Sequence, residues 1–146
     1  MRAPTPLLVL LGLLAACSRP PRTLAQEPSF QGEVRATVRT AAGTQALVEC
    51  ELAFHRAERH LQAVWRGAST VATSRLPDGR VVHFVDGSPA EPGAADRERF
   101  ARVVELVDAP PAQGARVVAI PDGYRVEEGD RVLEVRLRPL GDAHGR

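Results

Sequence analysis

The sequence predicts an α+β fold: a single curved antiparallel sheet of about eight strands with one packed helix. Three observations lead to this prediction. Apolar and polar residues alternate over several short segments, as is typical of half-buried strands. The tripeptide Pro-Asp-Gly occurs twice, at 77–79 and 121–123, where proline presets φ and glycine supplies the left-handed conformation of a turn. One later segment instead spaces its apolar residues for a helix.

Five consecutive strands are expected to form an antiparallel meander. The first begins near Phe30 and has one apolar face, formed by Val34, Ala36 and Val38. After a turn at Ala42-Gly43, the second strand has five inward residues: Ala46, Val48, Cys50, Leu52 and Phe54. A polar turn over 56–59 leads to a third strand with Leu61, Ala63 and Trp65 facing inward. The fourth strand (70–76) and the fifth (80–85) are joined by the first Pro-Asp-Gly, with Val82 and Phe84 on the side opposite to His83.

A helix and three further strands are expected to complete the domain. Asp96 has the character of a helix N-cap, and it precedes apolar residues at helical spacing: Phe100, Val103, Val104 and Val107. Pro110 and Pro111 end the helix. The last strands are expected over 115–120, 124–127 and 133–138, and the small core consists of valine, leucine and alanine.

The composition excludes several classes of function. Nineteen basic residues, all arginine, stand against 18 acidic residues, which argues against a nucleic-acid partner or a general affinity for anionic surfaces. The arginines of the outward strand faces are interleaved with glutamates, so a solvated face is favoured over an acidic-partner site. These arginines are Arg35, Arg39, Arg66, Arg75, Arg80, Arg136 and Arg138.

Two cysteines rule out a disulfide framework. Cys50 lies on the apolar side of a predicted strand and is expected to be a buried, inert thiol. A reactive thiol would need an electropositive setting, and its neighbours are Glu49 and Glu51.

Residues capable of catalysis or metal binding form no known motif. His55, Glu58 and His60 have the spacing H-x-x-E-x-H, not the H-E-x-x-H of helical zinc sites, and a solvated turn is favoured. His83 is expected to be a surface or hydrogen-bonded histidine. The sequence has no G-x-S-x-G elbow and no glycine-rich phosphate loop. We therefore expect no catalytic activity, no metal and no cofactor.

The N-terminal segment has the features of a secretion signal over residues 1–16. A positive head with Arg2 precedes an apolar run from Leu7 to Ala16, which is too short for a membrane-spanning helix. The run ends in Leu14-Ala15-Ala16-Cys17, which resembles the lipobox of bacterial lipoproteins at all four positions. The resemblance implies diacylation of the Cys17 thiol, cleavage before it and acylation of the new amino terminus. An ordinary secretory signal and a retained membrane anchor are the alternatives.

The remaining chain divides into a lipidated Cys17 with a proline-rich tether (17–29), the sheet domain (30–140) and a C-terminal tail (141–146) that contains His144. The tether is expected to be extended and unpacked, with a reach of about 35–40 Å, and the tail to be disordered. Ser18 after the acylated cysteine indicates, by resemblance to enterobacterial lipoproteins, the periplasmic side of the outer membrane.

Two functions are compatible with these features. The first is a lipid-anchored envelope module that binds a protein or another envelope partner without catalysis. The second follows from a resemblance to the outer-membrane lipoprotein carrier and receptor (Lol) family. This resemblance runs from Phe30-Gln31-Gly32 through the meander to Pro77-Asp78-Gly79 and the following helix. It implies a half-barrel with a cavity for acyl chains or lipoproteins between sheet and helix. The expected lining residues are Val48, Leu52, Phe54, Trp65 and Phe84.

Overall fold

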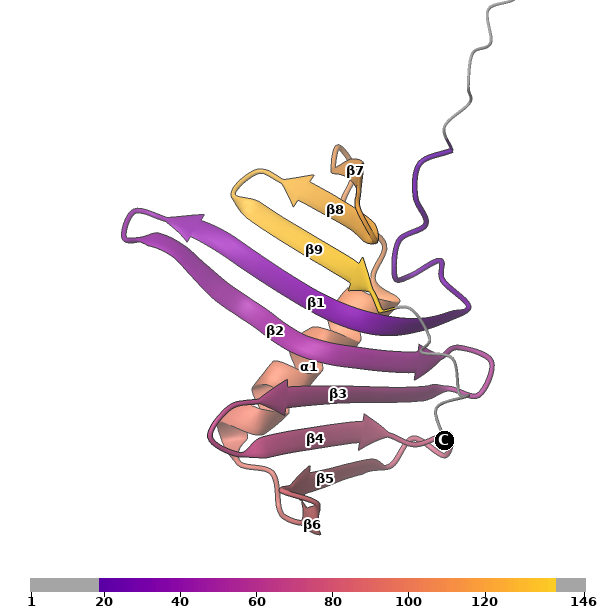
Figure 1. The fold of residues 1–146 in the computed structure, drawn as a ribbon, viewed down its shortest axis with the longest axis vertical. Helices are drawn as coiled ribbons and strands as arrows, with labels where there is room; N and C mark the ends of the chain where they lie inside the picture. The colour runs from indigo at the N-terminus through magenta and orange to yellow at the C-terminus, as the bar shows by residue number, and fades with distance from the viewer. Residues whose placement is uncertain (1–18, 139–146) are drawn as a thin grey trace, which may run out of the picture.

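The computed structural model of the chain describes residues 19–138 (Figure 1). Nine strands and one helix occur in this part of the chain. They are β1 (Ser29–Thr40), β2 (Gly43–His55), β3 (His60–Arg66), β4 (Thr70–Arg75), β5 (Val81–Val85), β6 (Ser88–Pro89), α1 (Ala94–Asp108), β7 (Arg116–Ile120), β8 (Gly123–Glu128) and β9 (Arg131–Leu137). All nine strands form one antiparallel sheet in the order β6-β5-β4-β3-β2-β1-β9-β8-β7.

The predicted architecture of one antiparallel sheet with one helix is confirmed. The sheet has nine strands where about eight were expected, because Ser88 and Pro89 add a two-residue strand β6 at one edge. With one helix against nine strands, the described chain is more β than α+β. The predicted meander is β1 to β5, and β9 pairs back onto β1, so the first and last strands of the described residues are neighbours in one sheet.

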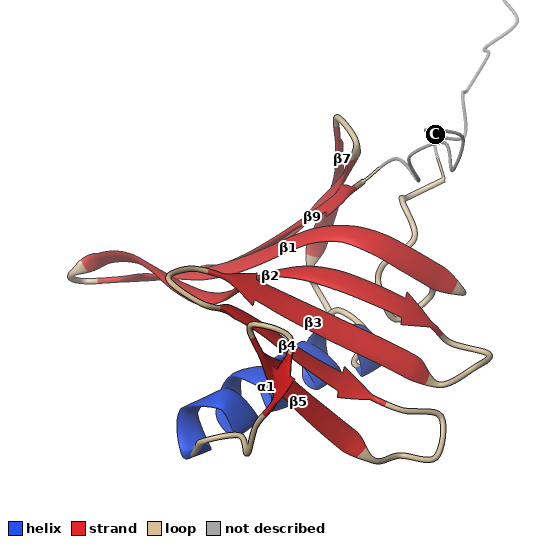
Figure 2. Cartoon of the chain, turned by 60° about the horizontal axis from the view of Figure 1, so that its bottom comes forward, coloured by secondary structure: helices blue, strands red, loops and turns tan. Residues whose placement is uncertain are grey.

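The sheet is curved and arches over α1 (Figure 2). Residues on the helix side of the central strands form one buried cluster with Phe100, Val103 and Val107 of α1. Removal of this apolar surface from water is the main stabilising contribution, at about 25 cal/mol per Å². Strands β7 and β9 rise away from the helix, so α1 covers the two halves of the sheet unequally (Figure 2).

A β-bulge interrupts the alternation in β2. Ala36 pairs with Val48, but Thr37 pairs with Ala46, which leaves Leu47 as the extra residue on β2. The bulge shifts the pairing by one residue, so Ala46 is exposed and does not extend the inward face of β2 as predicted.

Two local predictions are wrong. Asp96 is not the N-cap of α1: the helix begins at Ala94 with Gly93 as N-cap, and Asp96 lies in the first turn, where an acid favours the positive end of the helix dipole. The second Pro-Asp-Gly does reverse the chain, but Asp122 takes the left-handed conformation with φ 64°. Gly123 instead begins β8, where a side chain would collide with the Val135 carbonyl of β9.

The prediction of an unpacked tether is wrong for residues 23–28. Thr23 and Leu24 are buried, and Thr23 accepts backbone hydrogen bonds from Gln26 and Glu27 in a turn. The Leu24 amide donates to the hydroxyl of Tyr124 at 2.5 Å. The apolar side chain of Leu24 packs into the hydrophobic core. Burial of this side chain outweighs the preference of the nearby prolines for an extended, solvated backbone. The C-terminal tail from 141 and Cys17 lie outside the described residues.

Candidate functional site

The candidate site is a groove between one flank of α1 and the β1-β9-β8 part of the sheet. Its volume is about 500 Å³, within the range of ligand pockets. The turn over 23–25 and the segment over 109–112 form its remaining walls. Three leucines that are only partly buried line it: Leu47, Leu106 and Leu133. We call this space the groove.

The β2 bulge contributes directly to the groove. In a regular strand, neighbouring side chains point to opposite faces. Here Leu47, the bulged residue, and Val48 both line the groove, so the irregularity adds an apolar side chain to its wall. Bulges are common where a strand must redirect a side chain at a functional site.

The opposite flank of α1 is sealed. Leu52, Phe54, Leu61 and Ala63 pack in the buried cluster, and each has an exposed fraction of 2% or less. Phe30 stacks on Phe54 with ring centroids 6.0 Å apart. We call these five residues the sealed flank, because their side chains are buried in the core; Phe54 also borders a separate pocket.

The five expected lining residues are therefore divided between four places. Val48 lines the groove, whereas Leu52 and Phe54 belong to the sealed flank. Trp65 is on the helix side but is covered by the guanidinium of Arg99, 4.3 Å from its ring centroid. Phe84 is on the other face of the sheet, so its placement with the other four is wrong.

The error at Phe84 concerns which alternate residues of β5 point toward the helix. Leu52 pairs with Ala63, Ala63 with Thr73, and Thr73 with His83, so these four residues share the helix side. Phe84, next to His83, must point to the outer face. The apolar pair Val82 and Phe84 suggested the inward face, but here the inward position is occupied by a histidine with two polar partners.

The groove is apolar inside and polar at its rim. Arg102 and Glu105 of α1, with Glu128 and Arg131 around the β8–β9 turn, are at the rim. The Glu128 carboxylate accepts a hydrogen bond from the Ala112 amide at 2.8 Å, which fixes the segment after α1. Burial raises the pKa of the Tyr124 hydroxyl above its usual value, so at neutral pH it is a neutral hydrogen-bond acceptor for Leu24. Such a site can hold an apolar chain with a polar end, but it places no nucleophile beside a base.

The histidines of the sequence motif do not form a metal site in the described chain. His55 and His60 are cross-strand partners at the ends of β2 and β3, and Glu58 is exposed in the turn between them. Within residues 19–138, no group of three His, Cys, Asp or Glu side chains is arranged to hold a metal ion.

A row of three polar side chains that the sequence did not predict links β4, β5 and α1. The Thr73 hydroxyl is 2.9 Å from Nδ1 of His83, and Nε2 of His83 is 3.6 Å from the Asp96 carboxylate. The order hydroxyl, imidazole, carboxylate is that of a nucleophilic triad. Thr73 and His83 are only 2% and 6% exposed, however, so a substrate cannot reach the hydroxyl. These three linked side chains hold the start of α1 against the sheet. Only the register of β4 and β5 could have indicated it.

The prediction that Cys50 is buried is confirmed. Burial raises the pKa of its thiol to about 12, so the nucleophilic thiolate is scarce at neutral pH.

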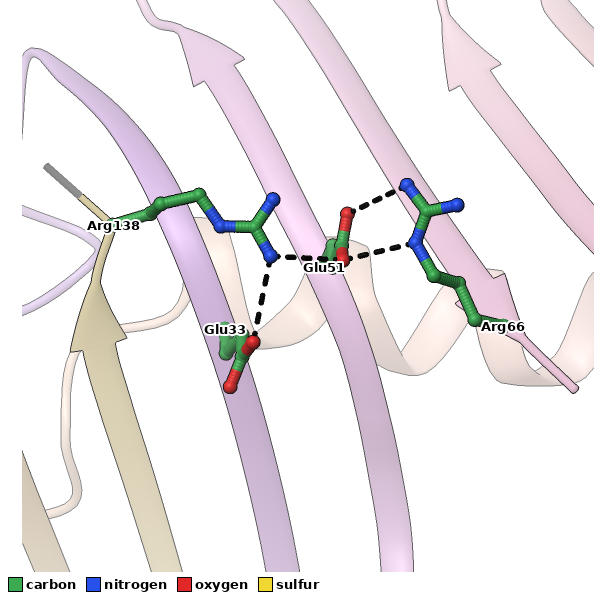
Figure 3. A network of polar contacts seen from close by, with 4 residues as sticks. All are labelled: Glu33, Glu51, Arg66 and Arg138. Atoms are coloured by element: carbon green, nitrogen blue, oxygen red, sulfur yellow. Dashed lines mark hydrogen bonds and ion pairs between the residues drawn. The ribbon is translucent and has the colours of Figure 1, made fainter. Parts of the chain in front are cut away.

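The outer face of the sheet carries several paired charges. Figure 3 shows the Glu51 carboxylate between two arginines, with Arg66 donating at 3.0 Å and Arg138 at 2.9 Å. Arg138 also approaches Glu33 at 3.5 Å. The hydrogen bond from Arg66 lowers the pKa of Glu51 most, and the hydrogen bond and charge of Arg138 lower it further. Because these charges pair with one another, they favour a solvated face over a site for an acidic partner.

The site proposed for lipid attachment, Cys17, lies outside the described residues. Of the residues that the structure describes, none belongs to a helix long and apolar enough to cross a bilayer. No protein-family model, curated protein or solved structure significantly matches this chain.

Proposed function

We propose that the chain is a lipid-anchored bacterial envelope protein that acts as a non-catalytic binding module, with the groove as its binding site. The observation that carries this proposal is the contrast across α1: one flank is sealed, and the other leaves about 500 Å³ lined by partly buried leucines. When a partner covers apolar surface of this kind, the free energy of the system falls, so binding is favoured. The lipobox supports an anchor at Cys17, on the periplasmic side of the outer membrane.

An acyl-chain carrier or receptor is the second candidate. One observation favours it: residues 23–25 form a wall of the groove, and they follow Cys17 closely in the chain. The groove would then lie near the membrane, the source of acyl chains. Each methylene that enters such a site contributes about 0.8 kcal/mol, so even part of a chain would bind measurably.

Titration with a fluorescent fatty acid tests the groove. The protein is the chain from residue 17 with Cys17→Ala, which keeps every described residue and carries no lipid. We expect saturable binding that Leu106→Gln weakens, because the amide replaces an apolar wall while glutamine remains a good helix former. Val81→Gln is the matched control, since Val81 is exposed and does not line the groove. Equal affinity of both variants would remove the groove as the site.

Native mass spectrometry separates the two candidates. An acyl ligand that co-purifies with the Cys17→Ala chain, and is lost in Leu106→Gln, supports the carrier. A ligand-free protein that nonetheless binds the probe supports a module for an apolar protein segment.

Metabolic labelling with a palmitate analogue tests the anchor separately. The wild type is expected to take up the label and Cys17→Ala is not. Equal labelling of both would refute acylation at Cys17 and leave the groove titration unaffected.

A further inference from the structure

A second pocket, of about 360 Å³, lies at the end of the sheet where β2 turns into β3 and β4 into β5. The C-terminal end of α1, Val107 and Asp108, closes one side. Its lining shares no residue with the groove and is rich in basic side chains: His55, Arg56, Arg59, His60 and Arg75. We call it the basic pocket.

The carboxylates of the basic pocket are already engaged. Asp108 pairs with Arg75 at 3.4 Å and Asp78 with Arg80 at 2.6 Å. Within residues 19–138, neither Arg56 nor Arg59 has a carboxylate at ion-pair distance. These two guanidinium charges are the ones left to attract an anion.

The two arginines differ in their freedom. Arg56 donates hydrogen bonds to the backbone carbonyls of Leu24, Glu27 and Val107, so it holds the N-terminal segment and α1 together. Arg59 is exposed in the β2–β3 turn, beside Glu58, which is also exposed and does not line the pocket. Arg59 is therefore the guanidinium available to a ligand.

The backbone at Arg59 is an independent indication. Its φ is 55°, in the left-handed region that residues other than glycine, asparagine and aspartate rarely adopt. Residues held in such conformations at a cost cluster at functional sites. A glycine would suit this turn better, and the arginine present supplies a charge to the pocket instead.

The N-terminal segment places the basic pocket near a bilayer. Arg56 binds Leu24 and Glu27, so the chain that leads to Cys17 departs from beside the pocket. Because residues 23–28 are packed, six residues, 17–22, separate the packed segment from the proposed lipid, and a chain of that length spans at most ~20 Å. This step rests on the proposed lipidation of Cys17.

We propose that the basic pocket binds the phosphate of an anionic phospholipid headgroup, with Arg59 as the residue that reaches it. The guanidinium fork matches phosphate oxygens with two parallel hydrogen bonds. The pocket volume suits a headgroup. Together with the short tether, this contact holds the β2–β3 end of the sheet against the membrane surface.

Vesicle flotation of the chain from residue 17 with Cys17→Ala tests the proposal, with phosphatidylglycerol vesicles and phosphatidylcholine vesicles compared. We expect a preference for phosphatidylglycerol that Arg59→Gly lowers about fivefold. The variant should melt no lower than its parent, because glycine accepts the left-handed backbone, so lost binding is not lost folding. Arg39→Gln is the control: Arg39 is exposed at the opposite end of β1 and should leave binding unchanged.

Three results would overturn the proposal. They are equal binding by Arg59→Gly and its parent, an equal loss in Arg39→Gln, and saturation of the pocket by inorganic phosphate without vesicle binding. Because the tested chain carries no lipid, failure of the palmitate labelling and failure of vesicle binding are separate results.

Discussion

The two flanks of α1 face the same side of one sheet, yet only one of them is filled. On the sealed flank, aromatic and leucine side chains of β1, β2 and β3 occupy the space down to 2% exposure or less at Leu52, Phe54 and Leu61. On the other flank, β9 and β7 curve away, and the helix offers Leu106 across the groove. Closing a space of this size would need larger side chains than the alanines and prolines that follow α1. The comparison separates residues buried in the core from residues left partly exposed in the groove.

Truncation on the sealed flank should have the largest effect on stability. Leu61 is fully buried, so Leu61→Ala is expected to lower the free energy of unfolding by about 2–5 kcal/mol through lost burial and the cavity left behind. Urea unfolding measures the loss. Leu133→Ala, in the groove wall, is the matched comparison, and we expect a smaller loss because Leu133 is only partly buried. If the two variants were equally destabilised, the distinction between the flanks would fail.

The next effect concerns the wall shared by the groove and the N-terminal segment. Tyr124→Phe removes the hydroxyl that accepts the Leu24 amide. A buried donor left without a partner costs about 1–3 kcal/mol. Thermal unfolding should show this loss, and hydrogen exchange at Leu24 should become faster. Unchanged exchange would mean that the segment over 23–25 is held by its other contacts.

A smaller effect, measured as a rate, concerns the Cys50 thiol. Its pKa of about 12 and its burial predict slow alkylation by iodoacetamide at neutral pH in the folded protein. The same thiol in urea should react quickly, and Leu61→Ala should lie between the two because it opens the core more often. Fast labelling of the native protein would contradict a closed core at this position.

The smallest expected effect is on the outer face. The pKa of Glu51 is lowered by the bonds from Arg66 and Arg138, so the carboxylate stabilises the fold above the usual glutamate pKa. This contribution is lost as the pH falls through the lowered pKa. Wild type should therefore be slightly more stable than Glu51→Gln at pH 7, and the difference should vanish in acid. A difference that grows on acidification would contradict the assignment.

The sequence predicted the elements better than their faces. Alternation and the first Pro-Asp-Gly located the strands of the meander, the second Pro-Asp-Gly located the reversal from β7 to β8, and the helical spacing of Phe100, Val103 and Val107 located α1. The inward face of β5 was wrong, because apolar content at Val82 and Phe84 does not reveal that His83 has polar partners on two other elements.

The groove could not be located from the sequence for related reasons. Its wall depends on a one-residue bulge at Leu47, on the unequal curvature of the sheet and on a segment that looked like a tether. Each of these is set by tertiary packing. A signal for the last was present in Leu24, an apolar residue inside a polar, proline-rich stretch.

Methyl NMR with a spin-labelled fatty acid tests most directly whether the open flank of α1 is the binding surface. The label broadens signals of nearby methyl groups, so each leucine reports its own distance to the ligand. We predict broadening at Leu47, Leu106 and Leu133 and sharp signals at Leu52 and Leu61. Equal broadening at all five leucines, or none at the three in the groove, would contradict the assignment of this flank as the binding site.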